Sequence, residues 1–183
     1  MVNAVGSPSG VSEGVYYSRT DYAGVGRRLV ILSVDSAVLL VLLMAVLASY
    51  IVLTPDSESA FHLHSLAYLS MSFLYLAVVS RSRLGTVGYM LTGVRVVGLG
   101  GDVPSLGAMA YRSLFAVLGP LNALIDIMWV GGDPNRQSLR DKLAGTYIVR
   151  RWAQPAGRGR LRHVSISFLG YTFMVNEVGR DVT

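Results

Sequence analysis

The sequence contains no cysteine, so the chain can form neither a disulfide bond nor a thiolate metal site. Charged residues are also scarce: they make up 15% of the 183 residues, against about 25% in a typical soluble domain. Lysine is nearly absent, because Lys142 is the single lysine among the basic residues. Hydrophobic residues make up 52% of the chain, and the mean hydropathy is +0.48. This balance indicates a membrane protein rather than a soluble domain.

Two long runs of the sequence are almost free of charge. Residues 29–53 contain a single charged side chain, Asp35, and residues 60–79 contain no Asp, Glu, Lys or Arg. As a helix, the first run would extend about 37 Å at about 1.5 Å per residue, which is enough to cross a hydrocarbon core of about 30 Å. We therefore expect two membrane-spanning helices joined by the acidic turn at residues 54–59.

The charges at the ends of the two runs predict their orientation. Arginine pairs flank the outer ends of the runs, whereas the turn between the runs is acidic. Because basic residues concentrate on the cytoplasmic side, we predict a multi-pass protein of the cell membrane with its N-terminus in the cytoplasm. The side chains expected to anchor in anionic lipid headgroups are Arg27, Arg28, Arg81 and Arg83.

A third apolar segment, residues 105–130, is interrupted in three places. Arg112 lies in its first part, Gly119 and Pro120 form its middle, and Asp126 lies near its end. Proline removes a backbone donor and kinks a helix, and a segment that enters and returns keeps the basic C-terminal part in the cytoplasm. We expect two full spans plus a kinked, re-entrant third segment, and a third full crossing is the alternative.

The two ends of the chain differ from the membrane segments. Residues 1–26 are rich in Gly and Ser and lack the apolar core of a signal peptide, so we expect a flexible cytoplasmic tail. Residues 27–151 form the expected membrane domain, and residues 152–183 form a basic linker and a cytoplasmic tail that favours a strand or hairpin. With strands also expected at 94–97 and 146–149, the predicted fold is an all-α membrane protein with short cytoplasmic strand-like elements.

Asp35 is the residue that most needs an explanation. A carboxylate inside a span costs about 2.5 kcal/mol or more, so it needs a partner or a function. Arg28 lies seven residues away, about 10 Å along the helix axis, which is too far for pairing within the helix. We predict that Asp35 pairs with Arg112 or Arg95 from another segment. Such a pair would fix helix packing, the interpretation we favour, or form a proton or cation site.

Two further aspartates are candidate site residues. Asp126 lies near the end of the third segment, and we expect an interfacial residue or a partner of Arg112 rather than an ion ligand. Asp141 lies in a short predicted helix, where it would cap the helix or pair with Arg95 or Arg136. No metal site and no cofactor are expected, because no cluster with metal-ligand spacing is present.

Three stretches resemble the RDD family, which is named for one arginine and two aspartates. GRRLVILSVDSAVLL resembles the family's first span, with Arg28 and Asp35 at the family's spacing. TVGYMLTGVRVV resembles the central motif, and RQSLRDKLAGTYIV resembles the last motif, in which Asp141 is the second aspartate. Arg112 corresponds to the arginine that opens the family's third span. The resemblance covers about residues 22–151.

Membership of this family implies a small integral membrane protein, and a sodium–proton antiport role has been proposed for some members. Three residues depart from the family pattern, because Val87, Tyr89 and Arg140 replace a usual Pro, Lys and His. Our first hypothesis is transport of a cation, a proton or a solute, with Asp35 as the intramembrane carboxylate.

The alternative hypothesis is a non-catalytic scaffold or assembly subunit that docks another protein through its C-terminal tail. In that case four charged residues are structural ion-pair residues: Arg28, Asp35, Arg112 and Asp141. We do not expect an enzyme, because no catalytic constellation is present, and we do not expect nucleic-acid binding, because no such motif accompanies the basic charge. The expected partners are anionic lipids and either further copies of the chain or another membrane protein.

Overall fold

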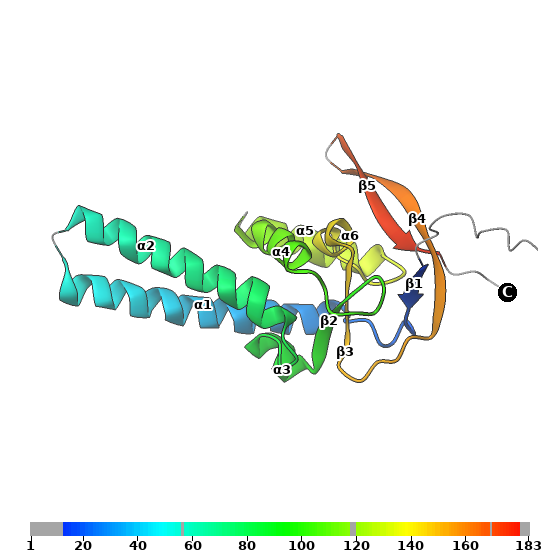
Figure 1. The fold of residues 1–183 in the computed structure, drawn as a ribbon, viewed down its shortest axis with the longest axis horizontal. Coiled ribbons are helices and arrows are strands. Elements are labelled where there is room, and N and C mark those ends of the chain that lie inside the picture. The colour runs from blue at the N-terminus through cyan, green and yellow to red at the C-terminus, as the bar shows by residue number, and fades with distance from the viewer. Residues whose placement is uncertain (1–12, 56, 118–119, 169, 180–183) are drawn as a thin grey trace, which may run out of the picture.

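Two long antiparallel helices project as a hairpin from a part of the chain that mixes short helices with strands (Figure 1). The first helix, α1, spans Val25–Leu53, and the second, α2, spans Glu58–Phe73. A π-helical turn, η1 (Leu74–Val78), and a 3-10 turn, η2 (Val79–Arg81), continue α2 to the base of the hairpin, the end at which α1 begins. This computed structural model describes the following residues: 13–55, 57–117, 120–168 and 170–179.

Both arms of the hairpin are long and apolar enough to span a membrane, with 29 residues in the first and 24 in the second. Their apolar side chains lie mostly exposed, as Val52 (77%) and Leu63 (65%) illustrate. A soluble protein buries such helices in its core, so this exposed apolar surface favours a membrane hairpin. Two helices with the length and composition of the predicted spans are therefore present, although α1 begins at Val25 rather than at residue 29.

The third apolar segment forms two helices instead of one. Helix α4 spans Leu106–Val117 and helix α5 spans Pro120–Gly132, and both lie near the base of the hairpin (Figure 1). Their 12 and 13 residues correspond to about 18–20 Å each, less than the roughly 30 Å of a hydrocarbon core. The predicted interruption is thus present, between helices separated by residues 118–119, which lie outside the described residues. Whether the pair enters the bilayer stays a prediction.

The strands form two antiparallel sheets. Strand β2 (Val94–Gly98) pairs with β3 (Thr146–Arg150), so the strands predicted at 94–97 and 146–149 are present. The second sheet has the order β1-β4-β5, and its strands are β1 Glu13–Tyr16, β4 Gly157–Phe168 and β5 Tyr171–Val178. The helices agree with the predicted all-α class, but the 12 residues of β4 and the eight of β5 are longer than the short strand-like elements expected.

The prediction of a flexible tail is wrong for residues 13–24. Strand β1 pairs with β4, and the rings of Tyr17, Tyr22 and Tyr147 lie within 6.4 Å of one another, buried between the two sheets. The hydroxyl of Tyr22 also accepts the backbone N–H of Tyr17 at 2.9 Å. Aromatic burial orders this stretch despite its Gly- and Ser-rich composition. Residues 1–12 lie outside the described residues.

Helix α3 (Val87–Thr92) is the short element that the central motif builds against α1. The hydroxyl of Thr86 accepts the N–H of Tyr89 and so caps the start of α3. Gly93 ends the helix in the left-handed conformation, with φ of 64°, which glycine adopts without strain. Gly88 lies directly against the backbone of α1, because a Cβ there would come within 2.9 Å of Ile31.

We predict that Gly88→Ala destabilises the protein by about 1–3 kcal/mol, because the added methyl group overpacks a contact between two backbones. The measurement is thermal unfolding of the purified protein in detergent. Gly26→Ala in the first turn of α1 is the matched control, since a Cβ there meets nothing within 4 Å. Equal midpoints for the two variants would show that α3 does not depend on this close approach.

Candidate functional site

Three charged side chains that are far apart in the sequence meet at the base of the hairpin. Arg28 comes from the start of α1, Arg112 from α4, and Asp141 from α6 (Leu139–Ala144). Nη2 of Arg28 lies 2.6 Å from Oδ2 of Asp141, and Nη1 of Arg112 contacts Oδ1 of the same carboxylate. The three residues are at most 6% exposed. We call these residues, Arg28, Arg112 and Asp141, the central cluster.

The residues at the start of α6 position Asp141 between the two arginines. Ser138 caps α6, and its hydroxyl accepts the N–H of Asp141 at 3.3 Å while the Asp141 carboxylate accepts the N–H of Ser138 at 3.1 Å. This capping box holds the carboxylate at the start of the helix, where exposed backbone N–H groups favour negative charge. The predicted cap is therefore confirmed, but the ionic partners are Arg28 and Arg112 rather than Arg95 or Arg136.

Further hydrogen bonds of the two guanidinium groups tie the central cluster to its surroundings. Arg28 donates from Nε to the carbonyl of Ala23 at 3.2 Å and from Nη2 to the carbonyl of Arg136 at 2.8 Å. Arg112 donates to the hydroxyl of Thr146 at 2.7 Å, at the start of β3. The cluster thus joins α1, α4, α6 and β3. Arg28 is consequently not a headgroup anchor, which corrects its assignment from sequence.

The charge balance of the central cluster keeps Asp141 ionised. Burial raises the pKa of the Asp141 carboxyl, but the neighbouring guanidiniums of Arg112 and Arg28 outweigh burial and hold this pKa well below its usual range. Asp141 therefore carries its charge at every physiological pH, and it does not exchange a proton near neutrality. Its chemistry is that of a fixed counter-ion between two buried cations.

Asp35 lies in a separate site made of uncharged donors. Its carboxylate accepts hydrogen bonds from the hydroxyl of Tyr75 at 2.8 Å, the hydroxyl of Thr86 at 2.7 Å and the N–H of Gly88 at 2.9 Å. These donors come from η1 and from the start of α3. Only 8% of Asp35 is exposed.

The prediction that Asp35 pairs with Arg112 or Arg95 is wrong. Arg112 belongs to the central cluster, and Arg95 donates instead to the carbonyl of Ala153 at 3.2 Å. Among the described residues, no basic side chain forms an ion pair with Asp35. The physical reason is that three aligned dipoles, one of them a backbone N–H at a helix start, stabilise the carboxylate in place of a cation.

Asp126 pairs with Arg140, which corrects the predicted partner Arg112. Oδ2 of Asp126 lies 2.6 Å from Nε of Arg140, and this pair links α5 to α6. Among the remaining predicted headgroup anchors, Arg81 and Arg83 are exposed and Arg27 is half-buried. Their binding to lipid headgroups stays a prediction.

One ionic group was missed by the sequence analysis. The single lysine, Lys142, is buried with Nζ 2.6 Å from Oδ2 of Asp133 and 3.6 Å from Oε2 of Glu177 in β5. The rarity of lysine in this chain was the one feature of the sequence that could have pointed to Lys142.

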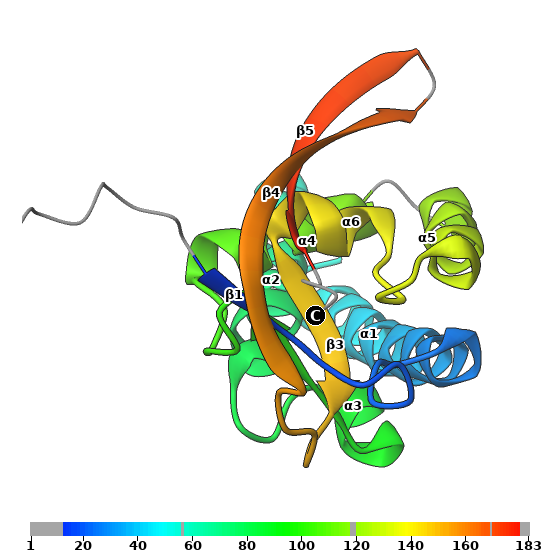
Figure 2. The ribbon, with the colours of Figure 1, turned by 90° about the vertical axis from the view of Figure 1, so that its right-hand side faces the viewer.

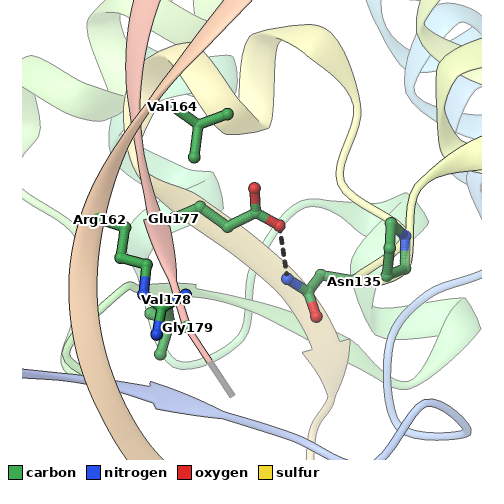
Figure 3. A pocket seen from close by; sticks show the side chains of 7 residues that line it. Asn135, Arg162, Val164, Glu177, Val178 and Gly179 are labelled. Carbon is green, nitrogen blue, oxygen red and sulfur yellow. Dashed lines mark hydrogen bonds between the residues drawn. The ribbon is translucent and has the colours of Figure 1, made fainter. Parts of the chain in front are cut away.

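Beside this group, a cavity of about 270 Å³ separates β5 from the Asn135 loop, and Asn135 donates to Glu177 across it at 3.4 Å (Figure 3). The described residues contain no group of three or more His, Asp or Glu placed to hold a metal ion.

We predict that Asp141→Asn lowers the stability of the folded protein by about 3–5 kcal/mol, because two buried guanidiniums lose their counter-charge. The measurement is chemical unfolding of the purified protein in detergent. Glu13→Gln is the matched control: its ion pair with Arg158 is 3.8 Å long and exposed, so it contributes about 0–1 kcal/mol. A loss for Asp141→Asn no larger than for the control would contradict a central role for the cluster.

Comparison with known proteins identifies a family for the part of the chain that holds these residues. The model of the RDD family matches residues 22–145, a range that includes the central cluster, Asp35 and α3. No curated protein and no solved structure matches the chain significantly. Because the family model covers most of the chain, the protein belongs to the RDD family.

Proposed function

We propose that this protein is a non-catalytic membrane scaffold that presents its C-terminal strands to a partner protein. The observation that carries the proposal is that the charged motif residues are paired within the chain itself. Asp141 neutralises two arginines, and Asp35 accepts three hydrogen bonds from α3 and η1. These contacts join the hairpin to the strands. The charged residues thus serve to hold the elements in place, as expected for a scaffold.

The docking surface of the proposed scaffold is the ribbon formed by residues 161–168 of β4 and by β5. Strand β1 pairs only with residues 157–160 of β4, so no other described strand covers the edges of the ribbon farther out. Figure 2 shows the ribbon projecting beyond the helices. A two-stranded ribbon is marginal by itself, and an uncovered edge accepts another strand.

One face of the ribbon is apolar. The cross-strand pairs Val164–Val175 and Ile166–Phe173 lie on this face, where Val175 is buried against the rest of the chain. The opposite face carries Ser165, Ser167 and the exposed Met174. Tyr171, also on the apolar face, is 71% exposed. Residues 163–176 contain no Asp, Glu, Lys or Arg, although charged residues are the usual protection of free strands against association. An uncharged apolar face of this kind fits a partner protein.

Transport remains the second candidate, and one observation favours it. The π-helical turn η1 carries Tyr75 to the Asp35 carboxylate, and such turns are rare and often found at functional sites. A carboxylate has about four acceptor positions, of which three are used in Asp35. A proton or a cation would have to compete with these donors.

We expect no cation-driven pH change in proteoliposomes that hold the purified protein, for wild type or for Asp35→Asn. The reason is that Asp35 is occupied by donors rather than open to an ion. The assay follows a trapped pH dye after pulses of sodium, potassium or lithium. Asp102→Asn, at an exposed position, is the control. Flux in the wild type and the control that disappears in a folded Asp35→Asn variant would replace the scaffold proposal with transport.

We expect the double variant Ile166→Lys, Phe173→Lys to release the chain from a larger complex in its native membrane, because lysines on the apolar face block docking. The full chain is solubilised in mild detergent and its assembly mass is measured. Ser165→Lys, Thr172→Lys on the opposite face is the matched control and should stay in the complex. The proposal fails if both double variants behave alike, or if the wild-type assembly contains only copies of this chain.

A further inference from the structure

An apolar patch covers the outer face of α3 and the turn before it. The exposed side chains are Leu84 (61%), Val87 (40%), Met90 (49%) and Leu91 (69%). Their spacing of three to four residues places Val87, Met90 and Leu91 on one helix face. The inner face, with Gly88, packs on α1. Helix α3 is therefore apolar on both sides, which is unsuited to contact with water.

Trp152 stands beside this patch with 86% of its surface exposed. The neighbouring Arg151 holds it there, because the Arg151 N–H donates to the carbonyl of Gly93 at 2.8 Å and its Nη2 donates to the carbonyl of Leu84 at 2.7 Å. Both ends of α3 are thus tied to the segment that carries Trp152. An exposed indole next to leucines is typical of the boundary between lipid and water.

The chain segments that form the patch carry basic but no acidic side chains. Arg81 and Arg83 are exposed on the turn that leads to Leu84. The stretches at 79–101 and 143–176, which supply α3 and Trp152, contain no aspartate and no glutamate. Asp35, the acid bonded to the start of α3, is buried on the inner side of that helix. The exposed Arg81 and Arg83 therefore attract anionic lipid headgroups.

The hairpin sets the depth at which a bilayer meets α3. Asp35 bonds to Thr86 and Gly88, so the start of α3 lies level with Asp35 on α1. From residue 36 to the end of α1 there are 18 residues, which extend about 27 Å, close to the roughly 30 Å of a hydrocarbon core. A bilayer that covers the hairpin down to Asp35 therefore ends at α3, whose apolar face continues the apolar surface of the hairpin.

We propose that Leu84, the outer face of α3 and Trp152 form an interfacial foot that rests in the bilayer at the base of the hairpin, with Arg81 and Arg83 on anionic headgroups. The foot lies in the plane of the membrane and does not cross it. It fixes how deep the hairpin sits and how the strands face the lipid surface. This inference is independent of whether the protein is a scaffold or a transporter.

Trp152 reports directly on the foot, because the chain has only one other tryptophan, Trp129. The full-length Trp129→Phe variant is reconstituted into vesicles of phosphatidylcholine and phosphatidylglycerol with brominated acyl chains. We expect Trp152 emission to be quenched most by bromines close to the headgroups, less by bromines near the chain ends, and little by aqueous iodide. Emission that iodide quenches and brominated lipids do not would overturn the proposal. If Trp129→Phe does not fold, the difference between wild type and Trp152→Phe supplies the same measurement.

The basic part of the foot is tested with the same signal. Adding phosphatidylglycerol to phosphatidylcholine vesicles should increase the lipid quenching of Trp152, and Arg81→Gln, Arg83→Gln should remove that increase. Arg158→Gln, Arg160→Gln on β4, also exposed, is the matched control and should retain it. An equal response of the two double variants would mean that net charge, and not the foot, draws the protein to anionic lipid, and would overturn the assignment of Arg81 and Arg83.

Discussion

The ionic contact of one carboxylate, Asp141, with two buried guanidiniums is the constraint on which the rest of this structure depends. Arg28 belongs to the membrane hairpin, Arg112 to the short helix pair and Asp141 to the helix that leads into β3. Burying either arginine alone would be costly, because an unpaired buried cation loses its hydration without compensation. The three elements therefore hold one mutual arrangement. This arrangement also fixes the position of β3, which begins directly after α6.

The two aspartates of the family motif are stabilised in different ways. Asp141 faces full positive charges, whereas Asp35 faces two hydroxyls and a backbone N–H. With the bilayer placed as proposed above, Asp35 lies near the level at which the hydrocarbon begins and Asp141 lies beyond the base of the hairpin, which accounts for the difference. Neutral donors serve a carboxylate at that boundary without bringing a second charge into the bilayer. The same donors fix α3 against α1.

The departures from the family pattern have structural consequences. Arg140, in place of a usual histidine, binds Asp126 and links α5 to α6. Tyr89, in place of a lysine in the motif that the sequence resembles, accepts a hydrogen bond from Arg112 at 3.4 Å through its hydroxyl. Val87, in place of a usual proline, adds to the apolar outer face of α3. Arg140 and Tyr89 are therefore both engaged in contacts within the chain.

The sequence by itself determined the hairpin, the break in the third segment, the strands β2 and β3, and the cap at Asp141, because hydropathy, proline and capping act over a few neighbouring residues. Only the tertiary structure decided the partners of Asp35, Arg112 and Asp141. Ion pairing depends on which helices approach each other, and the sequence offered more arginines than there are carboxylates to bind them. The order of residues 13–24 was likewise a tertiary outcome, since Tyr17 and Tyr22 are held by rings and strands more than 100 residues away.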